Sequence, residues 1–268
     1  MMMNFYFSIA SGSSGNCAVW SCDGTTVLID LGVSVRALNT ALRQIDLEIT
    51  DLDAVLLTHE HTDHIKGLTT FVKKYDVPIY ATFGTASAIL LRQPQTQKNF
   101  RTFAAGDSFS IGALHIQSIP IPHDAAEPTA YRLDGSECLG YATDIGYLTE
   151  QLRNAMSGCE TLVLESNHDV EMLKNGVYPM YLKQRIRGQY GHLSNEECAM
   201  GAVEWARKGT KRFILSHLSD KNNTPLTALR CTQRMVERNG CEVYVAPRSA
   251  MEQPLTIQKE EPQCSLFD

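Results

Sequence analysis

The sequence predicts an α/β protein in which two β-sheets pack face to face, with helices on the outside. Strand-like apolar runs alternate with helix-like runs along the chain, and no linker or low-complexity stretch divides them. A cluster of histidines directly follows one of the apolar runs. With 268 residues and 43% hydrophobic content, the chain is long enough for one sizeable core, or for two small half-domains that share it.

The expected elements follow from hydrophobic runs and the residues that bound them. Strands are expected at 5–10, 18–21, 26–30, 54–58, 79–81, 114–119, 139–142, 161–165, 213–216 and 242–245. Helices are expected at 33–44, 65–75, 85–91, 149–156, 195–208 and 225–239. Ser194, followed three residues later by Glu197, forms the capping-box pattern that starts the fifth helix. We expect one folded domain over 1–251 and a flexible tail over 252–268.

The most informative segment is Thr58-His-Glu-His-Thr-Asp-His64, which places three imidazoles and an aspartate within six positions. The apolar run before it, 52–57, has buried-strand character, and a helix pattern follows it. The cluster is therefore expected on a turn at the C-terminal end of a strand. Imidazole and carboxylate groups together suit zinc, and also manganese or iron where oxygen ligands accumulate. A histidine-rich surface loop would explain the composition but not its place between a strand and a helix.

The spacing His59-x-His61-x-Asp63-His64 resembles the signature of the metallo-β-lactamase fold hydrolases. That resemblance implies a four-layer αββα sandwich and a site for two divalent metal ions, zinc or manganese. The superfamily includes lactamases, thioesterases, lactonases, phosphodiesterases and nucleases, so the resemblance leaves the reaction open.

The same resemblance implies further ligands at strand ends, where acidic and histidine residues do occur. His59, His61 and His123 would hold one ion, Asp63, His64 and His217 would hold the other, and Asp144 would bridge the two. Asp30 would support the histidine loop without touching metal. A single aspartate at a strand end is otherwise more often a helix cap or a turn residue. His115 lies in an alternating strand and is expected at the surface.

Several further segments together resemble the YycJ/WalJ group of this superfamily. They are 8–16, 59–67, 123–128, 165–169, 191–195 and 216–223, and the resemblance extends over about residues 5–247. It implies 5′ to 3′ exonuclease activity on DNA and a part in mismatch repair.

Other residues are candidates for binding a phosphate substrate or for proton transfer. Ser13 lies in a run of small residues whose backbone N–H groups can approach an anion, although a plain turn between strands has the same composition. Lys183 and Arg185 could hold backbone phosphates or could simply form a solvated helix face. His192 could protonate a leaving oxygen, and His168 is a second candidate for that role or for binding the 5′ phosphate. The expected reaction is attack on phosphorus by a hydroxide that the two ions share, with Asp63 among the catalytic residues.

The tail sequence 263–267, Gln-Cys-Ser-Leu-Phe, resembles the pentapeptide with which bacterial repair proteins dock on the DNA sliding clamp. Gln263, Leu266 and Phe267 would make that contact, and the second position departs from the usual leucine. Apolar residues at the end of a polar tail are typical of short motifs that order on binding.

Net charge, cysteine pattern and hydrophobic runs narrow the classes of protein to which the chain can belong. The net charge of −6 argues against nucleic-acid binding over the whole surface. The eight cysteines include no Cys-x-x-Cys pair, which favours reduced thiols in a cytoplasmic protein, and no run is long enough to cross a membrane.

Two other readings stay open: a small-molecule hydrolase, such as a cyclic phosphodiesterase or lactonase, and a non-catalytic scaffold that docks on a repair complex. A tRNA-processing enzyme of the same fold is disfavoured, because the twenty residues between His123 and Asp144 leave no room for a tRNA-gripping arm. The chain likewise offers no space for the large cap domain of the RNA-degrading branch.

Overall fold

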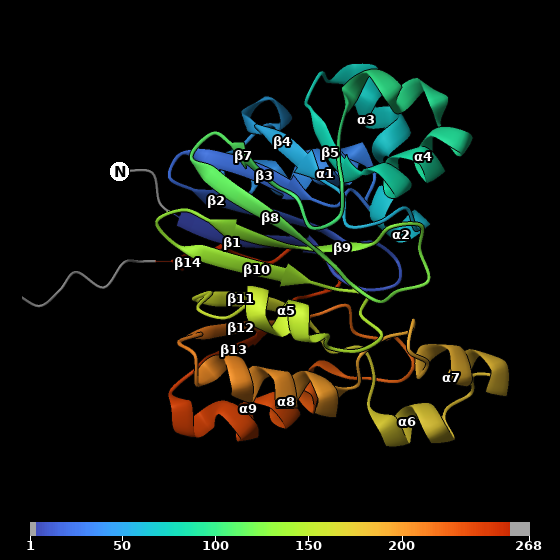
Figure 1. The fold of residues 1–268 in the computed structure, drawn as a ribbon, viewed down its shortest axis with the longest axis vertical. Helices are drawn as coiled ribbons and strands as arrows, with labels where there is room; N and C mark the ends of the chain where they lie inside the picture. Colours follow the sequence, from blue (N-terminus) through green and yellow to red (C-terminus); the bar gives the residue numbers. More distant parts are fainter. Residues whose placement is uncertain (1–3, 258–268) are drawn as a thin grey trace, which may run out of the picture.

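The computed structural model describes residues 4–257. Two seven-stranded sheets lie face to face, and helices cover the outer side of each (Figure 1). The expected αββα sandwich is therefore confirmed.

The first sheet holds most of the N-terminal half of the chain. Its strand order is β14 (Leu255–Ile257), β1 (Asn4–Ala10), β2 (Cys17–Cys22), β3 (Thr25–Ile29), β4 (Ala54–Leu56), β5 (Ile79–Thr82) and β6 (Phe100–Phe103). The strands from β3 to β6 run parallel. The helices on its outer face are α1 (Val35–Arg43), α3 (Leu68–Lys74) and α4 (Phe83–Arg92), at the top of Figure 1.

The second sheet holds most of the C-terminal half. Its strand order is β13 (Glu242–Val245), β12 (Arg212–Ser216), β11 (Thr161–Glu165), β10 (Cys138–Ala142), β9 (Thr129–Asp134), β8 (Leu114–Pro120) and β7 (Ser108–Ile111). The strands from β10 to β13 run parallel. The helices packed against it are α5 (Glu150–Ala155), just below β10 in Figure 1, and α8 (Asn195–Ala206) and α9 (Pro225–Val236), at the bottom.

Three apolar layers hold the sandwich together. The central layer lies between the sheets, where Trp20 and Ile29 of the first sheet belong to the same buried cluster as Tyr131 and Ile214 of the second. The other two lie between each sheet and its helices. Strands buried on both faces read as nearly continuous apolar runs, which is why β3, β4 and β11 are visible in the sequence.

Several elements differ from the sequence expectation. Strands β6, β7 and β9 were not predicted, and the expected helix over 65–75 is instead two helices, α2 (Thr62–Ile65) and α3. Two further helices, α6 (Val170–Asn175) and α7 (Met180–Ile186), lie between β11 and α8. Three short 3₁₀ turns also occur in the described part of the chain, at Ile49–Asp51, Pro94–Asn99 and Glu237–Asn239.

The boundary expected for the flexible tail, at residue 252, is too early. Leu255–Ile257 form β14, which pairs antiparallel with β1. The apolar Leu255 and Ile257 pack with the central apolar layer, which explains why the chain stays with the sheet here. The tail motif at 263–267 lies outside the described residues.

The parallel strands of both sheets bring polar residues to one side of the molecule. Asp30 follows β3, His59 follows β4, Asp144 follows β10 and His217 follows β12. Helices α2 and α7, one from each half of the chain, lie on the right-hand side of Figure 1. Ligand sites in such sheets form where the carboxyl ends of parallel strands meet.

Candidate metal centre

Three residues that close strands adopt a left-handed backbone conformation. Asp30, Asp144 and His217 have φ angles of 60°, 59° and 55°. Non-glycine residues rarely adopt this conformation, and where it persists at a site the surrounding structure holds it in place. In the described chain the other two such residues, Asp23 and Asp46, are exposed. The sharp turn at each strand end therefore coincides with a residue of the candidate site.

Asp30 is fully buried and anchors the histidine loop. Its carboxylate accepts hydrogen bonds from the Thr58 backbone N–H at 2.8 Å and from the Thr58 hydroxyl at 2.9 Å and 3.0 Å. The Nδ1 atom of His64 lies 2.8 Å from Oδ2 of Asp30. A proton on Nδ1 leaves Nε2 of His64 free to act as a ligand.

His59, His61 and His123 form the first candidate ligand group. The rings of His59 and His61 meet edge to face with centroids 4.6 Å apart, and Nε2 of His123 lies 3.4 Å from Nδ1 of His61. The Nδ1 atom of His123 contacts the Gly191 carbonyl oxygen at 3.2 Å. That contact places a proton on Nδ1 and leaves Nε2 facing the other two rings.

Asp63, His64 and His217 form the second group. The Oδ2 atom of Asp63 lies 3.6 Å from Nε2 of each histidine. Asp144 lies between the two groups, with Oδ2 at 3.2 Å from His64 Nε2 and Oδ1 at 3.9 Å from His123 Nε2. The structure therefore brings together all seven residues expected as ligands.

Glu165, which sequence reasoning did not single out, is the fully buried centre of a hydrogen-bond network. Its Oε1 lies 2.8 Å from Nδ1 of His192 and 3.0 Å from Nδ1 of His217. Its Oε2 accepts the backbone N–H groups of Ile145 at 2.7 Å and Leu193 at 3.3 Å. The only signal in the sequence is a carboxylate that ends a strand of otherwise apolar and threonine residues.

The charges of the site are strongly coupled. Burial alone would lower the pKa of His64, but the neighbouring Asp30 and Asp144 raise the pKa to about 10. Burial alone would raise the pKa of Asp144, but His217 and His64 hold the pKa well below its usual value. Burial likewise tends to raise the pKa of Glu165, and His192 and His217 bring the pKa down to about 2. The site thus holds buried carboxylates in their ionised form.

The donor atoms fit divalent metal ions. Nε2 of His59, Nε2 of His217 and Oδ2 of Asp144 are buried and make no hydrogen bond within the described residues. Buried polar atoms without a partner are costly, and a bound cation would satisfy all three. In each ligand group the donor atoms lie within 4.8 Å of one another, which suits ions with nitrogen and oxygen bonds of about 2.0–2.2 Å.

A cavity of about 250 Å³ opens onto these groups. Its wall includes Ser13, Asn167 and His192, together with Tyr178 and Arg185 from the α7 region. The candidate phosphate contacts Ser13 and Arg185 therefore do face the site.

Two other candidates do not line this cavity. Lys183 lies on α7, where its Nζ donates to the Lys174 carbonyl oxygen at 2.8 Å. His168 is buried, and burial lowers its pKa to about 4. A lowered pKa favours the neutral form of the His168 ring, so a role as proton donor stays a prediction. His115, in contrast, is exposed as expected.

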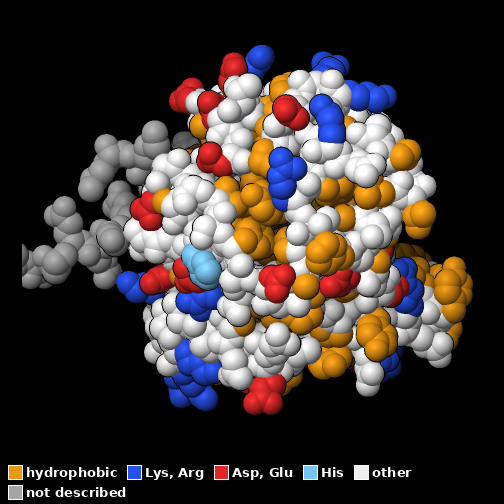
Figure 2. Space-filling model, turned by 45° about the horizontal axis from the view of Figure 1, so that its top comes forward, with side chains coloured by type: hydrophobic (Ala, Val, Ile, Leu, Met, Phe, Trp, Pro, Cys, Tyr) orange, Lys and Arg blue, Asp and Glu red, His pale blue; other side chains and the backbone are white. Residues whose placement is uncertain are grey.

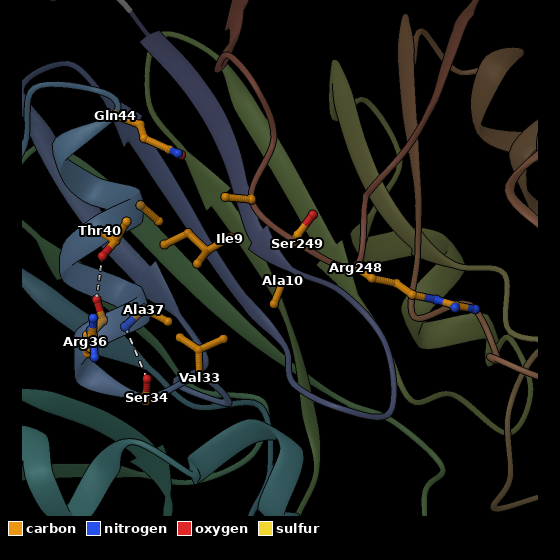
Figure 3. A pocket seen from close by; sticks show the side chains of 12 residues that line it. Ile9, Ala10, Val33, Ser34, Arg36, Ala37, Thr40, Gln44, Arg248 and Ser249 are labelled. Carbon is orange, nitrogen blue, oxygen red and sulfur yellow. Dashed lines mark hydrogen bonds between the residues drawn. The ribbon is translucent and has the colours of Figure 1, made fainter.

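A larger cavity, of about 430 Å³, lies between α1 and residues 248–250 (Figure 3). Ile9, Val33 and Ala37 lie close together there, while the Arg248 side chain extends away and pairs with Asp220. Neither a histidine nor a carboxylate is among the described residues that line it. It lacks the ligands of a metal centre, so the smaller cavity is the candidate site.

The family model of the β-lactamase superfamily domain matches residues 25–218. The chain belongs to this superfamily and is a metal-dependent hydrolase with the metallo-β-lactamase fold. It is 38% identical over 242 residues to exodeoxyribonuclease YycJ of Bacillus anthracis, covering 89% of this chain and 91% of that protein. It is 36% identical over 224 residues to exodeoxyribonuclease WalJ of Streptococcus pneumoniae, covering 81% and 82%.

Solved structures share the fold at lower sequence identity. The metallo-β-lactamase fold protein YhfI of Bacillus subtilis superposes with a TM-score of 0.74 at 18% identity, covering 92% of this chain and 98% of that one. Zinc-bound PqqB of Methylobacterium extorquens superposes with a TM-score of 0.70 at 19% identity, covering 96% and 100%. None of the helices in the described part of the chain combines the length and apolar character needed to cross a bilayer.

Proposed function

We propose that this chain is a DNA exonuclease that holds two divalent metal ions, zinc or manganese, and works from the 5′ end toward the 3′ end. The observation that carries the proposal is the pair of ligand groups that meet at Asp144, in a chain 38% identical to an exodeoxyribonuclease. Phosphodiester hydrolysis at such a site needs positioned charge, a nucleophile and a proton donor.

The two ions, when bound, would polarise the phosphoryl group and lower the pKa of a water molecule. His59, His61 and His123 would hold one ion, Asp63, His64 and His217 the other, and Asp144 would contact both. Asp30 fixes the tautomer of His64 through the 2.8 Å contact at Nδ1. Asp63 is only partly buried and also lines the cavity, so it lies where substrate and metal would meet.

His192 is the proposed proton donor for the leaving oxygen. Its side chain is 18% exposed and lines the cavity. Nδ1 is held by Glu165 at 2.8 Å, which leaves Nε2 as the nitrogen that can give a proton to substrate. Burial alone would lower the pKa of His192, but Glu165 outweighs it and raises the pKa above its usual value. This upward shift of the pKa favours the protonated form of the ring.

A polar groove favours a nucleic-acid polymer over a small-molecule substrate. The groove, of about 670 Å³, lies between α1 and the α2–α3 region. Four cations line it, Arg36, Arg43, Lys66 and Lys74, and the described residues that line it include no carboxylate. One of these cations, Lys66, lies two residues from His64 in the chain. Clustered cations on an otherwise acidic protein are the expected contact for a phosphate backbone.

The direct test uses duplex DNA, single-stranded DNA and RNA, each labelled at the 5′ or the 3′ end, with Mn²⁺ or Zn²⁺. A 5′ to 3′ exonuclease releases 5′ label first as mononucleotides and shortens 3′-labelled DNA step by step. Good turnover of small cyclic phosphodiesters or lactones without any DNA hydrolysis would replace the proposal with the small-molecule alternative.

Asp144→Asn tests the metal assignment, because asparagine tolerates the left-handed backbone while removing the charge. The variant should bind less than two metal ions per chain and lose DNA hydrolysis. Asp46→Asn, at a turn with a φ of 55°, is the matched control and should keep both. Two metals and normal turnover in Asp144→Asn would remove the assignment.

We further propose that the protein acts in DNA repair in the cytoplasm and docks on the DNA sliding clamp. It is supported by the tail sequence around Gln263, Leu266 and Phe267. Deleting residues 263–267 should abolish clamp binding in a pull-down with purified clamp and leave hydrolysis intact. Clamp binding that survives the deletion would dispose of the motif.

A further inference from the structure

The segment 177–190, called the α7 segment below, combines aromatic residues with cations. It contains three tyrosines, at 178, 181 and 190, and three cations, at 183, 185 and 187. It contains no aspartate or glutamate, although the whole chain carries a net charge of −6. Aromatic residues interspersed with cations, without acids, are typical of surfaces that bind single-stranded nucleic acid.

The hydrophobic side chains of the α7 segment are largely exposed. Val177 is 86% exposed, Tyr181 73%, Met180 68% and Tyr190 61%. Hydrophobic side chains are visible at the right-hand margin of Figure 2, on the side where Figure 1 places α6 and α7. Four large apolar side chains within fourteen residues form a surface that a partner is expected to cover.

The α7 segment is continuous with the metal centre. Tyr178, Leu182 and Ile186 line the cavity together with His61 and His192. The backbone N–H of His192 donates to the Ile186 carbonyl oxygen at 2.9 Å. A side chain at Gly191 would collide with carbonyl oxygens of Arg185 and Ile186, so the turn can be this tight only with glycine. The exposed tyrosines therefore lie on a segment that also lines the cavity of the metal centre.

The charges of the segment suit a nucleic acid better than a protein partner. Arg185 pairs with Asp124 at 2.7 Å, and Arg187 is exposed. Burial by itself would raise the pKa of Asp124, but the hydrogen bond from Arg185 lowers the pKa instead. An incoming phosphate would therefore meet exposed positive charge at Arg187, in a segment that also exposes aromatic rings able to stack on bases.

We infer that the α7 segment is a stacking platform for the unpaired bases of a single-stranded DNA end, with Tyr181 and Tyr190 on the base planes. The inference rests on the proposed nuclease function and deepens it, because it names the form of DNA that enters the site. A duplex end must then fray before its terminal phosphodiester reaches the metal centre.

The test compares Tyr181→Ala and Tyr190→Ala with two controls, Tyr181→Phe, which keeps the ring, and Leu91→Ala, which removes an 88% exposed side chain at the end of α4. The probe is a single-stranded phosphorothioate oligonucleotide, which resists hydrolysis, with 2-aminopurine near its end. Each alanine variant should bind about ten-fold more weakly, from the usual strength of base–aromatic stacking. The quenching of 2-aminopurine should fall as well, while both controls behave as the wild type.

The outcomes separate this inference from the proposed function. DNA hydrolysis by the wild type, with alanine variants that bind the oligonucleotide equally tightly, overturns the platform and leaves the nuclease intact. Tyrosine-dependent binding by a wild type that hydrolyses no DNA supports the platform and overturns the nuclease. A change of oligomeric state in Tyr181→Ala, seen by light scattering with oligonucleotide binding unchanged, assigns the surface to a second copy of the chain and overturns the platform.

Discussion

Replacing Glu165 by glutamine is the sharpest perturbation of the candidate metal centre. The carboxylate meets four donor groups: Oε1 contacts Nδ1 of His192 and of His217, and Oε2 accepts two backbone N–H groups. A glutamine has one accepting oxygen and one donating nitrogen. If its oxygen keeps the two backbone bonds, its NH₂ faces both imidazoles. Each ring must then accept at Nδ1 and carry its proton on Nε2.

The magnitude follows from that tautomer change. Nε2 of His217 is buried and makes no hydrogen bond to the described residues, so it is placed to be a metal ligand. Once Nε2 carries a proton, it cannot bind metal. For Nε2 of His217 to bind metal, the proton must return to Nδ1, where the Glu165 carboxylate no longer accepts it. The lost hydrogen bond to a charged group is worth about 1.5–3 kcal/mol. Since 1.4 kcal/mol is a factor of ten, metal affinity should fall about 10- to 100-fold, as for other groups that orient metal ligands. Turnover should fall by a similar factor, because His192 loses the carboxylate that keeps it protonated.

The assay is metal titration of the Glu165→Gln protein, combined with hydrolysis of labelled DNA at saturating metal. Glu160→Gln is the matched control, because Glu160 precedes the other end of β11 and accepts the Cys138 backbone N–H at 2.9 Å. It should change thermal stability without changing metal affinity. Metal affinity within two-fold of wild type in Glu165→Gln, with unchanged turnover, would refute the role given to Glu165.

Three further predictions concern the cationic groove, His168 and the bound metal ions. Arg43→Glu and Lys74→Glu should each weaken DNA binding and lower its salt dependence by about one unit of log–log slope, with hydrolysis of a small phosphodiester unchanged. His168→Gln should make the free energy of unfolding less sensitive to acid. The pKa of His168 is about 4 in the folded protein. The contribution of the neutral ring to stability is therefore complete above about pH 6.5, the pKa of an unperturbed histidine, and is lost as the pH falls toward 4. In urea unfolding, the free energy of unfolding should fall by about 2 kcal/mol more in the wild type than in the variant between pH 7 and pH 5. Chelation with EDTA should abolish hydrolysis and Mn²⁺ or Zn²⁺ should restore it; activity that persists in EDTA would contradict a metal-dependent reaction.

The parts of the fold that follow from the sequence are those with one dominant local cause. β3, β4 and β11 are buried on both faces and therefore read as apolar runs. The ligand set was named from the resemblance to the metallo-β-lactamase fold hydrolases, and Asp30 and His59 could be placed because each follows one of these runs. Strands β6 and β7 were missed because exposed polar side chains alternate with few buried ones, so no apolar run marks them.

Glu165 and His168 show the limit of sequence reasoning inside the site. The two residues are three positions apart, but Glu165 makes hydrogen bonds with two imidazoles and His168 is not among the partners of either ring. Which of the two side chains meets the imidazoles depends on the direction of the chain after β11. That direction is fixed by long-range contacts, such as the 3.0 Å hydrogen bond from the Asn167 N–H to the Leu193 carbonyl oxygen. No local pattern encodes a contact across so many residues.

The same reasoning explains why the α7 segment was hidden from periodicity and why it matters. A helix of a folded core places apolar residues on one face, and that stripe makes the helix visible in a sequence. In α7, Leu182 and Ile186 face the cavity, while Met180 and Tyr181 are apolar and exposed. Apolar residues on both faces blur the stripe. Where a sequence departs from the pattern of a stable helix, function is the expected reason. The exposed rings beside the metal centre are thus better explained by a ligand that covers them than by the fold.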